Sequence, residues 1–89
     1  MTDAPFDFDP AKNASNRLKH GIGLDEFEGF DGEAMVVIDD RADYGEERFS
    51  AFGRIGGLPY NLVFTRRGDR LRLISLRRAH REELDRYER

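Results

Sequence analysis

Residues 59–76, PYNLVFTRRGDRLRLISL, contain two stretches of alternating side chains separated by a short polar segment. Tyr60, Leu62 and Phe64 alternate with the residues between them, a period of two that is typical of a half-buried β-strand. Arg67-Gly68-Asp69 has the composition of a turn, and Arg70–Leu76 is predicted to be the next strand. Because strands joined by so short a turn pair in antiparallel fashion, this stretch predicts a β-hairpin.

Two more strands are predicted before this hairpin. Ala34–Ile38 is a compact apolar run rich in β-branched residues, and Glu47–Ile55 alternates loosely. The polar segment Arg41–Gly45 between them is predicted to be a loop. Gly56-Gly57 is a signal for a tight hairpin turn. Pro59 has no backbone N–H, so we expect it near the start or the edge of the third strand.

The N-terminal part predicts a helix with both ends marked. Asp9 is a suitable N-cap and Pro10 a suitable first helical residue. The helix is expected to continue to about His20, where Gly21 can adopt the left-handed conformation of a C-terminal cap.

Three further elements complete the predicted fold. Phe6-Asp7-Phe8 is expected to be a short edge strand, Leu24–Phe30 a second short helix, and residues from about Arg78 to Tyr87 a closing helix. The predicted class is therefore α+β, with helices packed on one face of a four-stranded antiparallel sheet. With 89 residues, the chain is expected to form a single domain over residues 1–89.

Composition argues against several functional classes. The chain has no cysteine, which excludes a disulfide framework and a cysteine-rich zinc site. His20 and His80 lie far apart, so neither a metal site nor a cofactor is expected. No apolar run approaches the roughly 20 residues of a membrane span, and the N-terminus lacks the pattern of a secretory signal. We therefore expect a cytoplasmic protein without a membrane partner.

The charge is distributed unevenly along the chain. Its net charge is −3, but residues 66–89 contain nine Arg against five acidic residues, a local charge of +4 that leaves −7 for the rest. Arginine presents a planar fork of donors that suits phosphate groups. This asymmetry predicts a basic working face, although a solvated surface of ion pairs would have the same composition.

The predicted last strand combines charged and apolar residues. Regular alternation would place Arg70, Arg72, Ile74 and Leu76 on one face and Leu71, Leu73 and Ser75 on the other. Arg77 and Arg78 follow, and Arg48, Arg54, Arg66 and Arg67 could converge with them on an open sheet face that holds an RNA backbone. Phe52, Tyr60 and Tyr87 could stack on unpaired bases, but core packing is the commoner role of such aromatic residues. No self-sufficient catalytic motif is present.

Five segments form an ordered series of landmarks: FDFDPAKN (6–13), NRLKHGI (16–22), YGEER (44–48), TRRGDRLRLISLRRA (65–79) and the Glu83–Tyr87 pair. They resemble, in the same order, the F-x-W/F-D-P-x-K, N-x-x-K-H-G-I/V, G-E-x-R, T-x-R-G-x-x-x-R-I/L-I-S-A-R-x-A and E-x-x-x-Y segments of the BrnT toxin family. The likeness covers nearly the whole chain. Leu76 departs from it, since the family has a small residue before the arginine.

The resemblance implies a RelE-like fold, with N-terminal helices packed on a four-stranded antiparallel sheet and a C-terminal helix. It also implies a ribonuclease toxin of a type II toxin–antitoxin system, which cuts RNA and is neutralised by a BrnA-like antitoxin. The antitoxin would carry the DNA-binding domain, so that the complex represses its own operon. The expected assembly contains two toxins and two antitoxins.

For a metal-independent ribonuclease of this kind, the expected reaction is attack of a ribose 2′-OH on the adjacent phosphate. We expect Arg66, Arg72, Arg77 and Arg78 to stabilise the developing charge, with Arg48 as a secondary member. Candidates for the general base are Glu47, His20, Lys19 and Tyr87, in no order. The alternative is a non-catalytic module whose Arg face docks an acidic partner segment, acting only as half of an autorepressing toxin–antitoxin complex.

Overall fold

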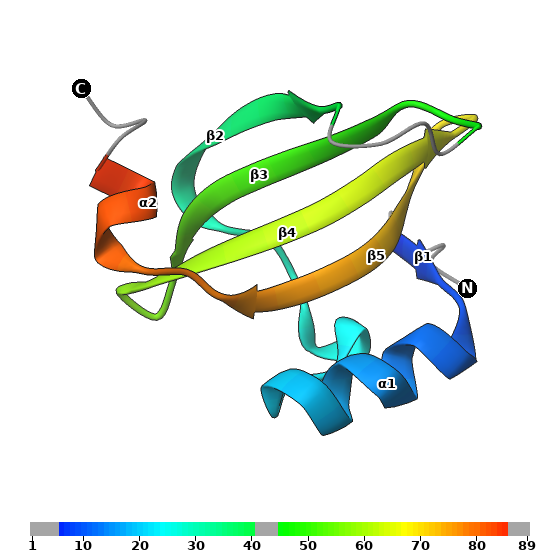
Figure 1. Ribbon diagram of the computed structural model, residues 1–89, viewed down its shortest axis with the longest axis horizontal. Coiled ribbons are helices and arrows are strands. Elements are labelled where there is room, and N and C mark those ends of the chain that lie inside the picture. The colour runs from blue at the N-terminus through cyan, green and yellow to red at the C-terminus, as the bar shows by residue number, and fades with distance from the viewer. Residues whose placement is uncertain (1–5, 41–44, 86–89) are drawn as a thin grey trace.

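The computed structural model describes residues 6–40 and 45–85 (Figure 1). Its elements are β1 (Phe6–Phe8), α1 (Pro10–His20), the single 3₁₀ turn η1 (Leu24–Glu26), β2 (Asp31–Asp39), β3 (Arg48–Ile55), β4 (Leu58–Arg67), β5 (Arg70–Arg78) and α2 (Arg81–Asp85). The predicted loop over Arg41–Gly45 lies almost entirely outside the described residues.

The strands form one five-stranded mixed sheet in the order β1-β5-β4-β3-β2. Neighbouring strands from β2 to β5 are antiparallel, whereas β1 pairs in parallel with β5, Phe6 opposite Leu71 and Phe8 opposite Leu73. The predicted RelE-like fold, with helices on a four-stranded antiparallel sheet, is therefore wrong. About half of the described residues lie in strands, and the segment Phe6–Phe8 adds a fifth strand because β5 offers it an unpaired edge.

The helical content is also lower than predicted. α1 is confirmed from Pro10 to His20, with the Asp9 carboxylate accepting the Ala11 N–H and Gly21 in the left-handed region at φ 74°. The predicted helix over 24–30 is only the turn η1, since the backbone is already extended at Phe27. The predicted start of the closing helix at Arg78 is wrong as well, because β5 continues to Arg78 and α2 begins at Arg81.

Aromatic packing explains why residues 27–30 are not helical. The ring of Phe27 makes edge-to-face contacts with Phe6 at 5.0 Å and with Phe30 at 5.1 Å between centroids. The backbone is extended at Phe27, and Gly29 has a φ of 125°, neither of which is a helical conformation. Tertiary contacts between aromatic rings thus override the local helical pattern.

The main core lies on one face of the sheet and is covered by the segment 22–30. Its buried residues are Leu24, Phe27, Ala51, Leu62, Phe64, Leu73 and Leu76. α1 lies mainly along the edge of β5 and against η1 and does not cover this face (Figure 1). The expectation of a helix packed flat on the sheet fails because α1 has no buried apolar stripe: Leu18 is 89% exposed and Asn16 is the one buried residue of the helix.

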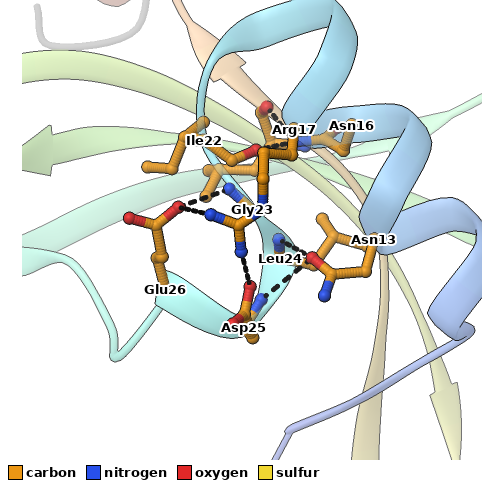
Figure 2. A network of polar contacts seen from close by, with 9 residues as sticks. Asn13, Asn16, Arg17, Ile22, Gly23, Leu24, Asp25 and Glu26 are labelled. Carbon is orange, nitrogen blue, oxygen red and sulfur yellow. Dashed lines mark hydrogen bonds and ion pairs between the residues drawn. The ribbon is translucent and has the colours of Figure 1, made fainter.

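Hydrogen bonds from three polar side chains attach α1 to the rest of the molecule. The Asn16 amide donates to the carbonyl oxygens of Ile22 and Leu76, both at 2.8 Å, and accepts the Leu76 N–H at 3.0 Å. Figure 2 shows the neighbouring contacts, in which Asn13 accepts the Leu24 N–H at 2.7 Å and Arg17 donates to Asp25 at 2.7 Å. Hydrogen bonds of polar side chains therefore hold α1 in place, whereas most surface helices are held by apolar packing.

Asn16→Ala should destabilise the fold by about 2 kcal/mol or more, because it leaves several buried backbone groups of Leu76 and Ile22 without partners. Urea denaturation of the two proteins measures this difference. Leu18→Ala on the same helix is the matched control, and its cost should stay within about 0.5 kcal/mol since Leu18 is exposed. Equal costs for the two variants would contradict the anchoring role of Asn16.

Gly53→Ala should also destabilise the protein, by about 1–3 kcal/mol. A Cβ atom at this position of β3 would lie 2.6 Å from Cδ1 of Phe30 and 3.1 Å from Cβ of Ala34. The cost, measured by urea denaturation, should shrink when the same substitution is made in a Phe30→Leu background. A Gly53→Ala protein as stable as the wild type would show that Phe30 does not pack over β3.

Candidate functional site

The sheet face opposite the main core carries most of the polar side chains of the strands. We call it the polar face and define it, from the strand registers, as Asp7, Arg48, Ser50, Asn61, Thr65, Arg72, Ser75 and Arg77. Thr65 stands between Arg48 of β3 and Arg72 of β5, and Asn61 stands opposite Arg77. At its far end this face is bordered by the apolar contact of Phe52 with Ala79.

A β-bulge in β5 brings Arg72 and Arg77 to the same face. Phe64 of β4 pairs with Leu73 and Val63 pairs with Ser75, so Ile74 is an extra residue in the ladder. In a regular strand two residues five positions apart point to opposite faces, and the extra residue reverses this. The predicted alternation, with Leu76 on the face of Arg72, is therefore wrong: Leu76 is 0% exposed and belongs to the core with Leu73.

Arg72 is paired with a carboxylate supplied by β1. The parallel register places Asp7 opposite Arg72, and Nη1 of Arg72 donates to Oδ2 of Asp7 at 2.8 Å. This hydrogen bond lowers the pKa of Asp7 below its ordinary value, so the carboxylate is ionised at neutral pH. The fifth strand thus contributes directly to the electrostatics of the polar face.

Arg77 makes a two-pronged ion pair with Glu83 of α2. Nη1 and Nη2 of Arg77 lie 3.1 and 2.9 Å from the two carboxylate oxygens, and the His80 N–H also donates to Glu83 at 2.9 Å. These hydrogen bonds lower the pKa of Glu83 from 4.5 to about 2. The short helix α2 is thereby fastened to the end of β5.

Arg48 lies at the opposite end of the polar face, among acidic groups. Its Nε atom is 3.7 Å from the Glu46 carboxylate, which is also 3.7 Å from Nη2 of Arg67. Asp39, a buried residue at the end of β2, stands opposite Arg48 in the ladder. Arg48 and Arg72 are separated by one strand, roughly 10 Å at the usual strand spacing.

The structure separates the five arginines predicted for the site. Arg48, Arg72 and Arg77 share the polar face and are half-buried. Arg66 is exposed near the end of β4, opposite Leu71, and the guanidinium of Arg78 lies over the ring of Tyr60 at 5.8 Å on the other face. The five side chains therefore do not form one cluster.

The candidates for a general base are also scattered. Glu47 precedes β3 beside Arg48, and its carbonyl oxygen accepts the Thr65 hydroxyl at 2.7 Å. Lys19 and His20 lie at the end of α1, and Tyr87 is outside the described residues. In residues 6–40 and 45–85, no group of three His, Asp or Glu side chains is placed to hold a metal ion.

Six residues that belong to the polar face or contact it were not predicted as members of a site: Asp7, Ser50, Asn61, Thr65, Ser75 and Glu83. Asn61 is buried in the middle of β4 and donates to Ser50 Oγ at 2.7 Å and to the Ala51 carbonyl at 3.1 Å. A polar residue between Tyr60 and Leu62 in an otherwise apolar strand was the available signal for Asn61. Glu83 was quoted only as part of the E-x-x-x-Y resemblance, because its pairing with Arg77 depends on how α2 meets β5.

The model of the family described as "ribonuclease toxin, BrnT, of type II toxin-antitoxin system" matches residues 8–83. The chain belongs to the BrnT family. No curated protein and no solved structure gives a significant match to it. The BrnT chain is thus a ribonuclease toxin, and its partner is an antitoxin protein.

The BrnT match includes the strands that carry the arginines of the polar face. It begins at residue 8, within β1, and ends at residue 83, the glutamate that pairs with Arg77. Within the described part of the chain no helix is long and apolar enough to cross a membrane.

The Arg77–Glu83 pair of this BrnT chain should make stability depend on pH. Because the folded-state pKa of Glu83 is lowered, the stability it contributes is present above about pH 4.5 and is lost as the pH falls toward 2. The difference in unfolding free energy between wild type and Glu83→Gln should shrink over this range in urea titrations. A ¹³C NMR titration should show the Glu83 midpoint near 2 in the wild type and higher in Arg77→Ala. A pH-independent difference would contradict the ion pair.

Proposed function

We propose that the polar face is the site at which this toxin cuts RNA, without a metal ion. The observation that carries the proposal is the gathering of three half-buried arginines, Arg48, Arg72 and Arg77, on one sheet face. Guanidinium groups on a rigid sheet are suited to stabilise the charge that develops on a phosphate in the transition state.

The proposed reaction is an internal transfer within the RNA. A ribose 2′-oxygen forms a bond to the adjacent phosphorus, and the bond from phosphorus to the 5′-oxygen of the next nucleotide breaks. A base takes the proton of the 2′-OH, and the departing 5′-oxygen receives a proton. The products are a 2′,3′-cyclic phosphate and a 5′-OH end.

The spacing of the arginines assigns them different roles in this proposal. Arg72 and Arg77 lie opposite Thr65 and Asn61, four positions apart on β4 and roughly 13 Å at the ordinary rise of a strand, so they suit different phosphates of one RNA strand. Arg48 and Arg72 are closer and can reach one phosphate from two sides. We therefore place the scissile phosphate between Arg48 and Arg72, with Arg77 binding a flanking phosphate.

The same reasoning ranks the candidates for the general base. Among those in the described residues, Glu47 adjoins Arg48 and is the base of this proposal, whereas Lys19 and His20 lie on α1 and are not. Glu83 is a poor base because Arg77 holds its pKa at about 2. Arg66 and Arg78 lie outside the polar face and have no role in cleavage in this proposal.

A second reading of the polar face concerns the antitoxin. Arg72 and Arg77 each already bind a carboxylate of the chain itself, Asp7 and Glu83. An acidic segment of the antitoxin could replace these carboxylates and occupy the face, which would explain neutralisation by competition with RNA. The proposed assembly has two toxins and two BrnA-like antitoxins, contacts operator DNA only through the antitoxin, and acts in the cytoplasm as a single toxin domain.

Arg72→Ala should lower kcat for cleavage of a single-stranded RNA by about 10²–10³-fold, since a charge-stabilising donor is lost at the scissile phosphate. Arg77→Ala should mainly raise KM. Arg81→Ala, which removes an exposed charge on α2, is the control and should leave both values unchanged. Cleavage is followed by gel electrophoresis, with the products tested for cyclic-phosphate ends.

Two results would contradict this assignment. Full activity of Arg72→Ala would show that the polar face is not the cleavage site. Absence of RNA cleavage by folded wild-type protein would favour the binding-module reading. Glu83→Gln separates the loss of the Arg77–Glu83 ion pair from the loss of Arg77 itself, because it keeps the guanidinium.

A further inference from the structure

A pocket of about 160 Å³ lies between α1 and the edge of β5. It is lined by Lys12, Ser15, Asn16, Lys19, His20, Ile74 and Ser75. The helical residues follow the i, i+3, i+4 and i+7 spacing of one helix face, so two lysines and a hydroxyl face the same groove. Lys12 and Lys19 are about 10 Å apart along the helix, which suits a chain of phosphates better than a single ion.

The cations of this groove differ from those of the polar face in having no acidic partner. No carboxylate lines the groove, and within residues 6–40 and 45–85 neither Lys12 nor Lys19 forms an ion pair. On the polar face, by contrast, Arg72 and Arg77 are neutralised by Asp7 and Glu83. Two positive charges without an ion pair among the described residues therefore lie together on α1, outside the proposed cleavage site.

The groove adjoins the polar face through the bulge in β5. β1 covers β5 only from Leu71 to Leu73, and the strand edge beyond it borders the pocket at Ile74 and Ser75. Ser75 belongs to both surfaces, three residues after Arg72 and two before Arg77. An extended polyanion on the polar face can thus pass over the edge of β5 and reach the lysines without leaving the protein surface.

We propose that this groove is a second RNA-binding site, in which Lys12, Lys19 and the hydroxyls of Ser15 and Ser75 hold backbone phosphates next to the cleavage site. The site contributes affinity and sets the path of the RNA, and it takes no part in bond breaking. The proposal rests on the proposed cleavage at the polar face, but binding in the groove is measurable without cleavage.

The test uses a fluorescein-labelled single-stranded RNA with 2′-O-methyl groups throughout, which cannot be cut because no 2′-OH is free. Its affinity for the full chain is measured by fluorescence anisotropy across a range of NaCl concentrations. Lys12→Ala/Lys19→Ala should bind roughly tenfold more weakly at 0.1 M salt, and the slope of log Kd against log[NaCl] should fall by about 1.4, or 0.7 for each lost phosphate contact. With cleavable RNA, the double variant should raise KM and keep the wild-type kcat.

The control is Arg81→Ala, which removes one exposed positive charge from α2 and is compared with Lys12→Ala and Lys19→Ala taken singly. It should change the affinity and the salt slope much less, and Lys12→Arg/Lys19→Arg should restore binding.

An unchanged salt slope in Lys12→Ala/Lys19→Ala, or an equal loss in the control, would overturn the proposal. The proposal would also be overturned if the lysine double variant no longer copurified with the antitoxin but still bound RNA. The groove would then hold an acidic segment of the antitoxin. If Arg72→Ala leaves cleavage intact but the lysine variant loses RNA affinity, the cleavage site is misplaced and the groove stands.

Discussion

The pairing of the Asn16 side chain with the backbone of Leu76 is the interaction on which the rest of the structure depends. The strand β1 covers only three residues of β5, and the buried Asn16 amide satisfies both polar backbone groups of Leu76 beyond that point. An unpaired strand edge is thereby closed by a helix that has almost no apolar face. The same contact positions α1 and its lysines beside the bulge, so the proposed RNA groove depends on the hydrogen bonds that also hold the helix in place.

The bulge at Ile74 decides which residues of β5 enter the core and which lie on the polar face. It lets Leu73 and Leu76 both enter the core, and it turns Arg77 to the face that already holds Arg72. Without the extra residue, both Leu76 and Arg77 would point to the wrong side of the sheet. Leu76 is the residue that departs from the family pattern quoted in the sequence analysis. Its side chain is fully buried, and its backbone bonds to Asn16.

Charge is divided between two surfaces with different roles. Arginines on the polar face are held in place by carboxylates from β1 and α2, which fixes the orientation of their guanidinium groups and lowers the net field there. The lysines of α1 keep their charge uncompensated among the described residues. This arrangement suits the binding of a polyanion. The lysines of α1, which act as point charges, attract it, and the arginines of the sheet, which are directional donors, orient it.

The sequence by itself determined the features that depend on local backbone preferences. Asp9, Pro10 and Gly21 mark the two ends of α1, and Gly56-Gly57, with both φ angles positive, form the turn between β3 and β4. It also indicated the family and the arginine-rich strand. Tertiary structure alone decided the parallel pairing of β1, the non-helical course of residues 27–30, the bulge at Ile74, and hence which arginines share a face. These depend on contacts between residues far apart in the chain, and no local pattern of polarity specifies which edge, ring or carboxylate a segment will meet.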